Sequence, residues 1–259
     1  MTPRTLTYFC EHPEYFMITA HRGASFEFPE NTLLSMQKAV EAGADMIEFD
    51  LRGTLDNVPV LLHDQTLDRT SNGTGFPEDH TLKDLKKLNF SYFLQEARRN
   101  TPVYDSVSIP AFEEILAALS GKVCMNIQIY AKNDETLKNI CFLFKKYEMY
   151  DYGYFTITPD YIDKVRSIDP EIEFCTTRGW QTRSSPEILN LCKGSDHCRF
   201  VQPVREFTGE KDFSLIRSLG LRSNVFFCDD PEEMLQLQKM GADGILTNKA
   251  HLMCANRPE

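Results

Sequence analysis

Four ionisable residues interrupt two apolar runs in the stretch IEFDLRGTLDNVPVLLHD, which spans residues 47–64. They are Glu48, Asp50, His63 and Asp64. A charge inside an apolar segment is costly unless it has a partner. Glu48 and Asp50 are two positions apart, so on a strand their carboxylates share one face. Two neighbouring carboxylates supply the hard oxygen ligands that Mg²⁺ and Ca²⁺ prefer.

The residues around this stretch predict an antiparallel hairpin. The gap between the apolar runs 46–52 and 58–63 is too short for a crossover helix, so the two runs must pair directly. Asp56-Asn57 suits a two-residue turn, which requires positive φ. With that turn at the centre, Asp50 lies directly opposite His63.

The hairpin therefore predicts a divalent-cation site that contains Glu48 and Asp50. The alternative is a structural salt-bridge network in which the same carboxylates pair with Arg22 or Arg52. Active sites of barrel enzymes gather at the C-terminal ends of the strands, which favours the cation site.

A second stretch, ITAHRGASFEFPENT (18–32), ends a predicted strand with His21-Arg22-Gly23. The planar guanidinium of arginine suits phosphate oxygens. An imidazole exchanges a proton near neutral pH, so His21 and His63 could act as acid and base. Two histidines, Arg22 and the paired acids predict a phosphodiester site.

These residues need a scaffold that brings strand ends together. The apolar runs lack polar alternation, which indicates a buried parallel sheet, and helix-period segments lie between them. The runs are 16–21, 46–52, 58–63, 123–129, 153–157, 172–176, 199–203, 223–227 and 244–247. The pattern predicts a (β/α)8 barrel, an α/β fold, with 58–63 as an added hairpin arm. We expect one domain over residues 1–259, with an insertion at about 64–109 that contains a short helix, 81–88.

A short echo links the two ends of the chain. Gly43-Ala44-Asp45-Met46-Ile47 matches Gly241-Ala242-Asp243-Gly244-Ile245. Each copy closes a predicted helix and opens a predicted strand, so we expect the same joint to be used twice.

Composition excludes several classes of partner. The 259 residues carry a formal net charge of −10, which repels nucleic acid and anionic membrane surfaces. No apolar run of about 18 residues exists, so no membrane insertion is expected. The start MTPRTLTYFCEHPEYF lacks the apolar core of a signal peptide. Reduced cysteines in the cytoplasm are therefore expected, although an exported mature form stays open. The oligomeric state is left open.

The motifs together resemble the glycerophosphodiester phosphodiesterase family, which has a phospholipase-C-like phosphodiesterase barrel. The similarity covers about residues 17–250, through HRGAS, PENT, GADMIEFD, PVLLHD, LDRTSNGTG, IPAFEEIL and GADGILTN. The resemblance implies a (β/α)8 barrel with a small insertion after the hairpin. It also implies a divalent cation, Mg²⁺ or Ca²⁺, and hydrolysis of a small glycerophosphodiester to glycerol 3-phosphate and an alcohol.

The resemblance also implies roles for individual residues. His21 and His63 would be the acid–base pair, Arg22 a phosphate contact, and Glu48 and Asp50 metal ligands. In such enzymes a neighbouring glycerol hydroxyl attacks phosphorus, and water then opens the resulting cyclic phosphate.

This chain departs from the family pattern on the strand that reads MNIQIYAK. Gln128 stands where a third metal carboxylate is expected, and Tyr130 stands where a lysine is expected. Gln128 can still donate a carbonyl oxygen, and Lys132 could substitute for the lysine if the strand continues. Near the end, Phe226-Phe227-Cys228-Asp229 replaces the usual run. Two alternatives stay open: action on a different phosphodiester, with a bulkier head group, and a non-catalytic phosphodiester-binding protein.

Overall fold

The computed structural model describes residues 4–92, 104–176 and 197–258. Six parallel strands form a curled sheet in the order β6-β5-β4-β2-β1-β9. Their bounds are β1 Met17–His21, β2 Met46–Gly53, β4 Cys124–Ile129, β5 Gly153–Ile157, β6 Phe174–Thr176 and β9 Gly244–Thr247. Each of these six strands was predicted from its apolar run.

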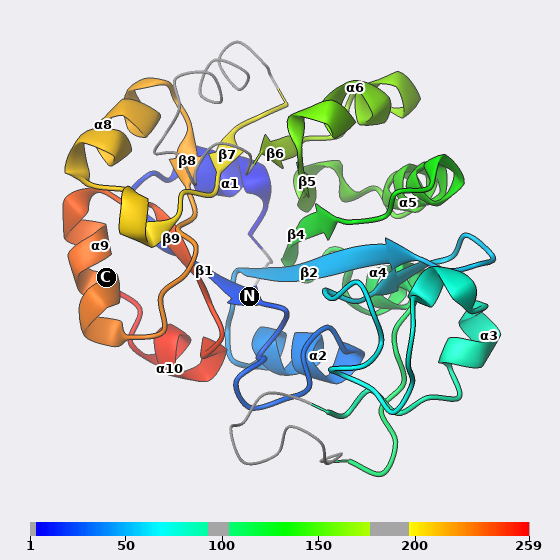
Figure 1. The fold of residues 1–259 in the computed structure, drawn as a ribbon. Coiled ribbons are helices and arrows are strands. Elements are labelled where there is room, and N and C mark those ends of the chain that lie inside the picture. Colours follow the sequence, from blue (N-terminus) through cyan, green and yellow to red (C-terminus); the bar gives the residue numbers. More distant parts are fainter. Residues whose placement is uncertain (1–3, 93–103, 177–196, 259) are drawn as a thin grey trace.

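A second pair of parallel strands extends this curled arrangement: β7 (Phe200–Val201) and β8 (Arg222–Ser223). A parallel bridge between Val225 and Ile245 joins the residues after β8 to β9. On the other side, the Phe174 N–H donates to the His197 carbonyl oxygen, which brings the start of β7 to β6. Eight parallel strands thus follow one another in chain order around a common centre (Figure 1). The arrangement confirms the predicted (β/α)8 class.

Helices surround the strands on the outside (Figure 1). They are α2 Leu33–Glu41, α4 Phe112–Leu119, α5 Asp134–Lys146, α6 Pro159–Ile168, α8 Glu210–Ser218, α9 Pro231–Met240 and α10 Ala250–Ala255. Short 3-10 turns lie at Met149–Asp151 and Arg205–Phe207. Capping fixes several helix starts. For example, the Asp230 side chain accepts the N–H groups of Glu232 and Glu233, as expected for the N-cap of a helix that begins at Pro231.

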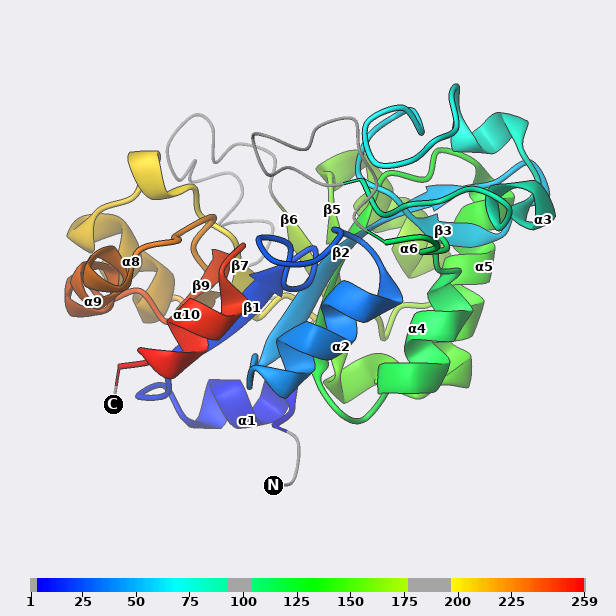
Figure 2. The same cartoon turned by 90° about the horizontal axis from the view of Figure 1, so that it is seen from below.

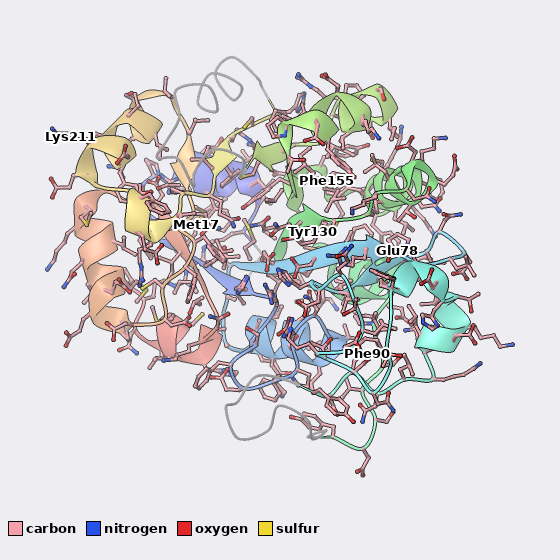
Figure 3. All side chains as sticks on the ribbon, in the orientation of Figure 1. Met17, Glu78, Phe90, Tyr130, Phe155 and Lys211 are labelled. Carbon is pink, nitrogen blue, oxygen red and sulfur yellow. The ribbon has the colours of Figure 1, made fainter. Side chains whose placement is uncertain are left out.

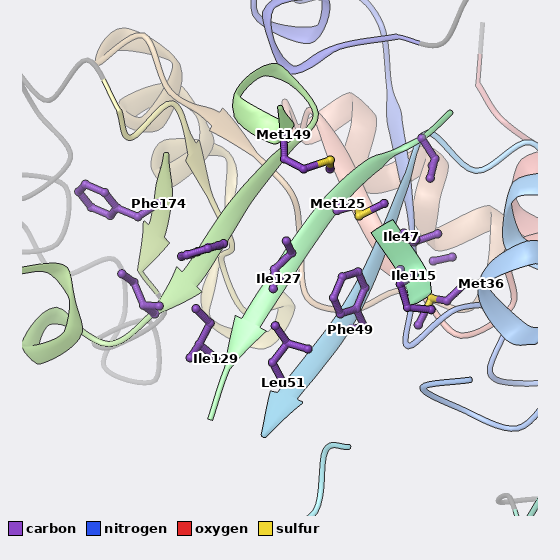
Figure 4. Packing of buried hydrophobic residues seen from close by; sticks show 14 of the residues in the cluster. Met36, Ile47, Phe49, Leu51, Ile115, Met125, Ile127, Ile129, Met149 and Phe174 are labelled. Atoms are coloured by element: carbon purple, nitrogen blue, oxygen red, sulfur yellow. The ribbon is translucent and has the colours of Figure 1, made fainter. Parts of the chain in front are cut away.

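Side-chain alternation along β2 separates the outer face of the barrel from its interior. Ile47, Phe49 and Leu51 point outward and are fully buried against helix residues such as Met36 and Ile115 (Figure 4). Glu48 and Asp50 must then point inward, because successive strand side chains face opposite ways. The register pairs Glu48 with Asn126, and Asp50 with Gln128, on β4.

The barrel interior changes from apolar to polar along its axis. At the N-terminal ends of the strands, helix α1 (Leu6–Glu11) packs Leu6 and Phe9 against Met17, Met46 and Tyr154. Next comes a layer of amide and hydroxyl groups, in which Asn126 donates to Gln202 and Asn224 donates to Thr19. The charged residues lie beyond this layer, at the C-terminal ends. Figure 2 shows α1 at one end of the barrel and the insertion with α3 at the other.

The hairpin exists, but its predicted register is wrong by one residue. Strand β3 (Pro59–Leu61) pairs Leu51 with Leu61 and Arg52 with Val60, so Asp50 faces Leu62 rather than His63. The cause is a three-residue loop instead of a two-residue turn. Thr54 pairs with Val58, and Asn57 takes a left-handed φ of 59°, a known hairpin geometry. His63 lies beyond the end of β3 and reaches the site from there.

The repeated Gly-Ala-Asp joint is confirmed. Gly43 and Gly241 both have positive φ, 89° and 102°, directly after a helix. The aspartate that follows each of them accepts a backbone N–H from a neighbouring strand: Asp45 binds Ile18, and Asp243 binds Ser223. Each joint therefore ties a new strand to its neighbour by a carboxylate as well as by the sheet hydrogen bonds.

The insertion after the hairpin carries a 3-10 turn, Pro77–Asp79, and a short helix, α3 (Leu82–Leu85). The predicted helix 81–88 begins correctly, with Thr81 as its cap, but ends three residues early. Apolar residues of the insertion pack with residues of the second hairpin arm in a small cluster separate from the main core. Its buried members are Val60, Leu62, Leu67, Leu85, Phe90 and Ile109.

Two sequence expectations concern the environment of the protein. None of the described helices is long and apolar enough to span a membrane. Six of the cysteines are free thiols, namely Cys10, Cys124, Cys141, Cys175, Cys228 and Cys254. Cys198, however, is disulfide-bonded, so the expectation that the cysteines are reduced is wrong at that position. Disulfides persist mainly in oxidising compartments, so cysteine usage no longer favours the cytoplasm.

Candidate active site

A cavity of about 230 Å³ opens at the C-terminal end of the barrel. It collects residues from five different segments of the chain. Its lining comprises His21, Arg22, His63, Gln128, Tyr130, Gln202, Val204 and Phe226. In Figure 3, which looks along the barrel, Tyr130 lies near the middle of the view. Both predicted histidines and the predicted arginine therefore face one space.

The loop after β1 holds a strained backbone. Arg22 and Asn31 both have left-handed φ values, 56° and 55°, which are uncommon for residues other than glycine. The Asn31 N–H donates to the Arg22 carbonyl oxygen over 3.1 Å and closes the loop. Gly23 has no room for a side chain, because a Cβ atom there would lie 2.5 Å from Ser35 Oγ. Strain of this kind gathers at functional sites.

Residues of this loop contact the two carboxylates of β2. The Arg22 N–H donates to Glu48 over 2.9 Å, and Arg22 Nε lies 3.4 Å from Asp50 Oδ2. Asn31 binds Asp50 twice: its side-chain NH₂ donates to the carboxylate, and its carbonyl accepts the Asp50 backbone N–H. Glu48 and Asp50 are each only 1% exposed.

The two carboxylates lie close together in a buried environment, which disfavours two negative charges there. Burial, together with the neighbouring Asp50, raises the pKa of Glu48 well above its usual value. Asp50 Oδ1 is buried and accepts no hydrogen bond. A buried acceptor without a partner is rare and calls for an explanation, and a bound cation would supply one.

His21 is oriented by the last strand of the barrel. Its Nδ1 lies 2.8 Å from Asn248 Oδ1. The other end of that amide is fixed, because Asn248 Nδ2 donates to Asp229. Oδ1 therefore faces the imidazole, Nδ1 carries the hydrogen, and Nε2 keeps its lone pair, 3.9 Å from Glu48 Oε2. Burial and the charge of Arg22 lower the pKa of His21, which favours the neutral ring.

His63 is held from the insertion side. Its Nδ1 lies 2.8 Å from Asp64 Oδ1, and Arg69 binds both oxygens of Asp64. Arg69 in turn binds both oxygens of Glu30 at 2.7 Å, and Glu30 also accepts from Arg22. A chain of charged groups thus runs from one histidine to the loop beside the other.

Comparison with known proteins decides the family. The profile of the Glycerophosphoryl diester phosphodiesterase family matches residues 21–252. This chain belongs to that family. It is accordingly a phosphoric diester hydrolase, and the resemblance seen in the motifs is confirmed.

One relative and one solved structure match most of this chain, and a second relative matches a shorter part at higher identity. A glycerophosphodiester phosphodiesterase of Bacillus subtilis is 29% identical over 91% of this chain and 84% of its own length. Over a shorter span, 27% of this chain and 21% of the relative, glycerophosphodiester phosphodiesterase 1 of Bos taurus is 50% identical. A crystal structure of an Oleispira antarctica phosphodiesterase in complex with its product sn-glycerol-3-phosphate has a TM-score of 0.81 at 23% identity, covering 95% of this chain and 98% of that one.

The six residues selected from the sequence of this phosphodiesterase all lie at one end of its barrel. His21, Arg22, His63 and Gln128 line the cavity. Glu48 and Asp50 lie buried and contact Arg22. The alternative salt-bridge network is present in part, because Arg22 pairs with Asp50 and Glu30. Arg52 instead donates to the carbonyl oxygen of His63.

The suggested substitution of Lys132 for the missing lysine of the phosphodiesterase is not supported. Strand β4 ends at Ile129, and Lys132 lines a separate pocket with Arg52 and Thr54. Tyr130 remains at the cavity, where Gln128 Nε2 donates to its phenol oxygen over 2.7 Å.

Sequence reasoning missed the residues that orient the two histidines. Asn248 and Asp229 fix His21, and Arg69 and Glu30 fix the partner of His63. One signal was available: Asn248 directly follows an apolar strand, the position where barrel enzymes place site residues. Arg69 and Glu30 are 39 positions apart in the sequence, and no sequence pattern indicated their contact.

Proposed function

We propose that this protein hydrolyses a glycerophosphodiester to glycerol 3-phosphate and an alcohol, with a divalent cation and two-histidine acid–base catalysis. The single observation that carries the proposal is the cavity itself. His21 lines it from the end of β1 and His63 from the segment after β3. Each has its Nδ1 engaged, so that its Nε2 is the atom left for proton transfer. Arg22 lines the same cavity as the phosphate contact.

The donors beneath the cavity fit a hard divalent cation. Glu48 and Asp50 supply carboxylate oxygens, and Asp50 Oδ1 has no other partner. Within residues 4–92, 104–176 and 197–258, no group of three His, Cys, Asp or Glu side chains is placed to hold a metal ion. We infer that the amide oxygen of Gln128, beside Asp50 in the sheet register, is the third ligand. When bound, the cation would stabilise charge on the phosphoryl oxygens.

The surroundings of the histidines favour His21 as the base and His63 as the acid in the first step. Burial and Arg22 lower the pKa of His21, so its Nε2 suits the base that takes the proton of the attacking glycerol hydroxyl as the new O–P bond forms. His63 has a carboxylate, Asp64, at its Nδ1, which pairs with the protonated ring. His63 Nε2 then gives its proton to the leaving alcohol oxygen as the old P–O bond breaks. Water opens the cyclic phosphate with the two roles reversed.

The activity is tested with a panel of glycerophosphodiesters that includes bulky head groups. Release of glycerol 3-phosphate is measured with Mg²⁺, Ca²⁺ or Mn²⁺ and again with a chelator. We expect turnover with a cation and its loss on chelation. Folded protein that releases no product from any diester with any of the three cations would overturn the proposal.

The assignment of base and acid is tested with a diester whose leaving group is p-nitrophenol, which departs without a proton. We expect His63→Ala to retain most of its nitrophenol release while losing alcohol release from an ordinary substrate. His21→Ala should lose both. His12→Ala, an exposed histidine near the other end of the barrel, is the control. Equal losses for His21→Ala and His63→Ala with both substrates would refute the assignment.

A further inference from the structure

The contact between Gln128 and Tyr130 has a consequence for the orientation of the amide. Gln128 Nε2 donates to the phenol oxygen of Tyr130 over 2.7 Å. Asp50 is paired with Gln128 across the sheet, yet its Oδ1 accepts nothing. The amide nitrogen is engaged by Tyr130, which leaves Oε1 as the free end of the amide.

The ring of Tyr130 is held from two sides, so its phenol oxygen has a defined place. The His63 ring packs edge-on against it with a centroid separation of 5.6 Å. The guanidinium of Arg52 lies 5.1 Å from its centroid. Arg52 is itself fixed, because Nε and Nη2 donate to the His63 carbonyl oxygen. A phenol held in this way can orient a flexible glutamine in advance of ligand binding.

We propose that Tyr130 is a positioning residue for the cation site: by accepting the Gln128 N–H, it turns Gln128 Oε1 toward Asp50 and Glu48 as a neutral third ligand. The inference rests on the cation of the proposed function. It adds a role for Tyr130 and explains how a chain with glutamine at this position keeps three oxygen donors. The opposite amide orientation, in which the phenol O–H donates to Oε1, would remove that ligand.

The test is the binding of Mn²⁺ to the full chain, measured by calorimetry in the absence of substrate. Tyr130→Phe removes the phenol oxygen and keeps the ring between His63 and Arg52. We expect the Kd for Mn²⁺ to rise about fivefold, the loss of one ordinary hydrogen bond. Tyr150→Phe is the matched control, because it also removes a tyrosine hydrogen bond, to Asp169. Circular dichroism melts confirm that both variants fold.

A double-mutant cycle separates positioning from a general structural effect. Gln128→Ala should weaken Mn²⁺ binding, and adding Tyr130→Phe to it should change nothing further, because the tyrosine acts through the amide. The same fivefold loss in both backgrounds would overturn the inference, as would an unchanged Kd in Tyr130→Phe. Either of these results leaves the proposed function standing. A wild-type protein that turns over its substrate but binds no cation would overturn the inference together with the proposed metal requirement.

Discussion

Among the single residues of the site, one arginine contacts three carboxylates. Arg22 binds Glu30 at 2.9 Å through its side chain, approaches Asp50 at 3.4 Å, and binds Glu48 through its backbone N–H. Burial, and then the neighbouring Asp50, raise the pKa of Glu48. A divalent cation bound to both carboxylates would favour their charged forms.

Replacing Gln128 with glutamate should tighten cation binding. The new carboxylate lies beside Asp50 in the sheet, so we expect the Kd for Mg²⁺ or Mn²⁺ to fall about tenfold, or about 1.4 kcal/mol. Without a cation the same charge should lower the melting temperature, because three carboxylates then repel one another. Calorimetry and melts with a chelator measure both effects. Gln65→Glu, which adds the charge in the neighbouring pocket, is the control. Unchanged affinity would place residue 128 outside the site.

The orientation of His21 depends on a neutral amide. In Asn248→Ala, the Nδ1 of His21 loses its acceptor and the ring can turn, so we expect kcat/KM to fall about 10- to 100-fold with little change in folding. Steady-state kinetics measure the loss. Asn256→Ala, which removes a hydrogen bond to Leu252 on α10, should be as active as the wild type. Full activity of Asn248→Ala would contradict the role assigned to that residue.

At the scale of elements, the hairpin shows what a sequence pattern can and cannot predict. The two arms, their antiparallel pairing and the shared face of Glu48 and Asp50 were correctly predicted, because they follow from strand period and gap length. The register was not correctly predicted, because the same sequence is compatible with a two-residue and with a three-residue loop. In the structure the loop has three residues, Leu55, Asp56 and Asn57. His63 still reaches the cavity, since it lies beyond the paired part of β3.

Asn57 provides a test of that loop. Its φ of 59° suits asparagine or glycine and strains a β-branched residue. We expect Asn57→Val to lower the free energy of unfolding by about 1–2 kcal/mol, whereas Asn57→Gly should stay within about 0.5 kcal/mol of the wild type. Urea denaturation measures both. Equal stability of the two variants would mean that the loop does not need this conformation.

At the scale of the whole molecule, Glu30 joins the insertion to the barrel. Arg69, from the insertion, and Arg22, from the loop after β1, both bind it. The order of the strands could be predicted, because each strand is a local apolar run in the sequence. The contact of Glu30 with Arg69 could not be predicted, because it depends on how the long insertion folds back onto the barrel. Neither residue lies in an apolar run.

The joint makes stability depend on pH. Although burial opposes it, Arg69 and then Arg22 lower the pKa of Glu30 below its ordinary value of 4.5. A carboxylate with a lowered pKa stabilises the folded state above its unfolded pKa and loses that effect as pH falls. Glu30→Gln should therefore cost about 3 kcal/mol at pH 7. The difference from wild type should shrink as pH falls below about 4.5. Urea titrations between pH 7 and pH 3 measure it. A difference independent of pH would show that the charge of Glu30 contributes nothing.

We propose that Glu48, Asp50 and Gln128 hold a divalent cation beneath the cavity that His21 and His63 line. Anomalous diffraction from crystals soaked in Mn²⁺ would locate this cation. We predict one anomalous peak about 2.0–2.6 Å from Glu48, Asp50 Oδ1 and Gln128 Oε1. Crystals of active protein that show no peak there, or a peak bound only by other residues, would show that these three residues do not hold the cation.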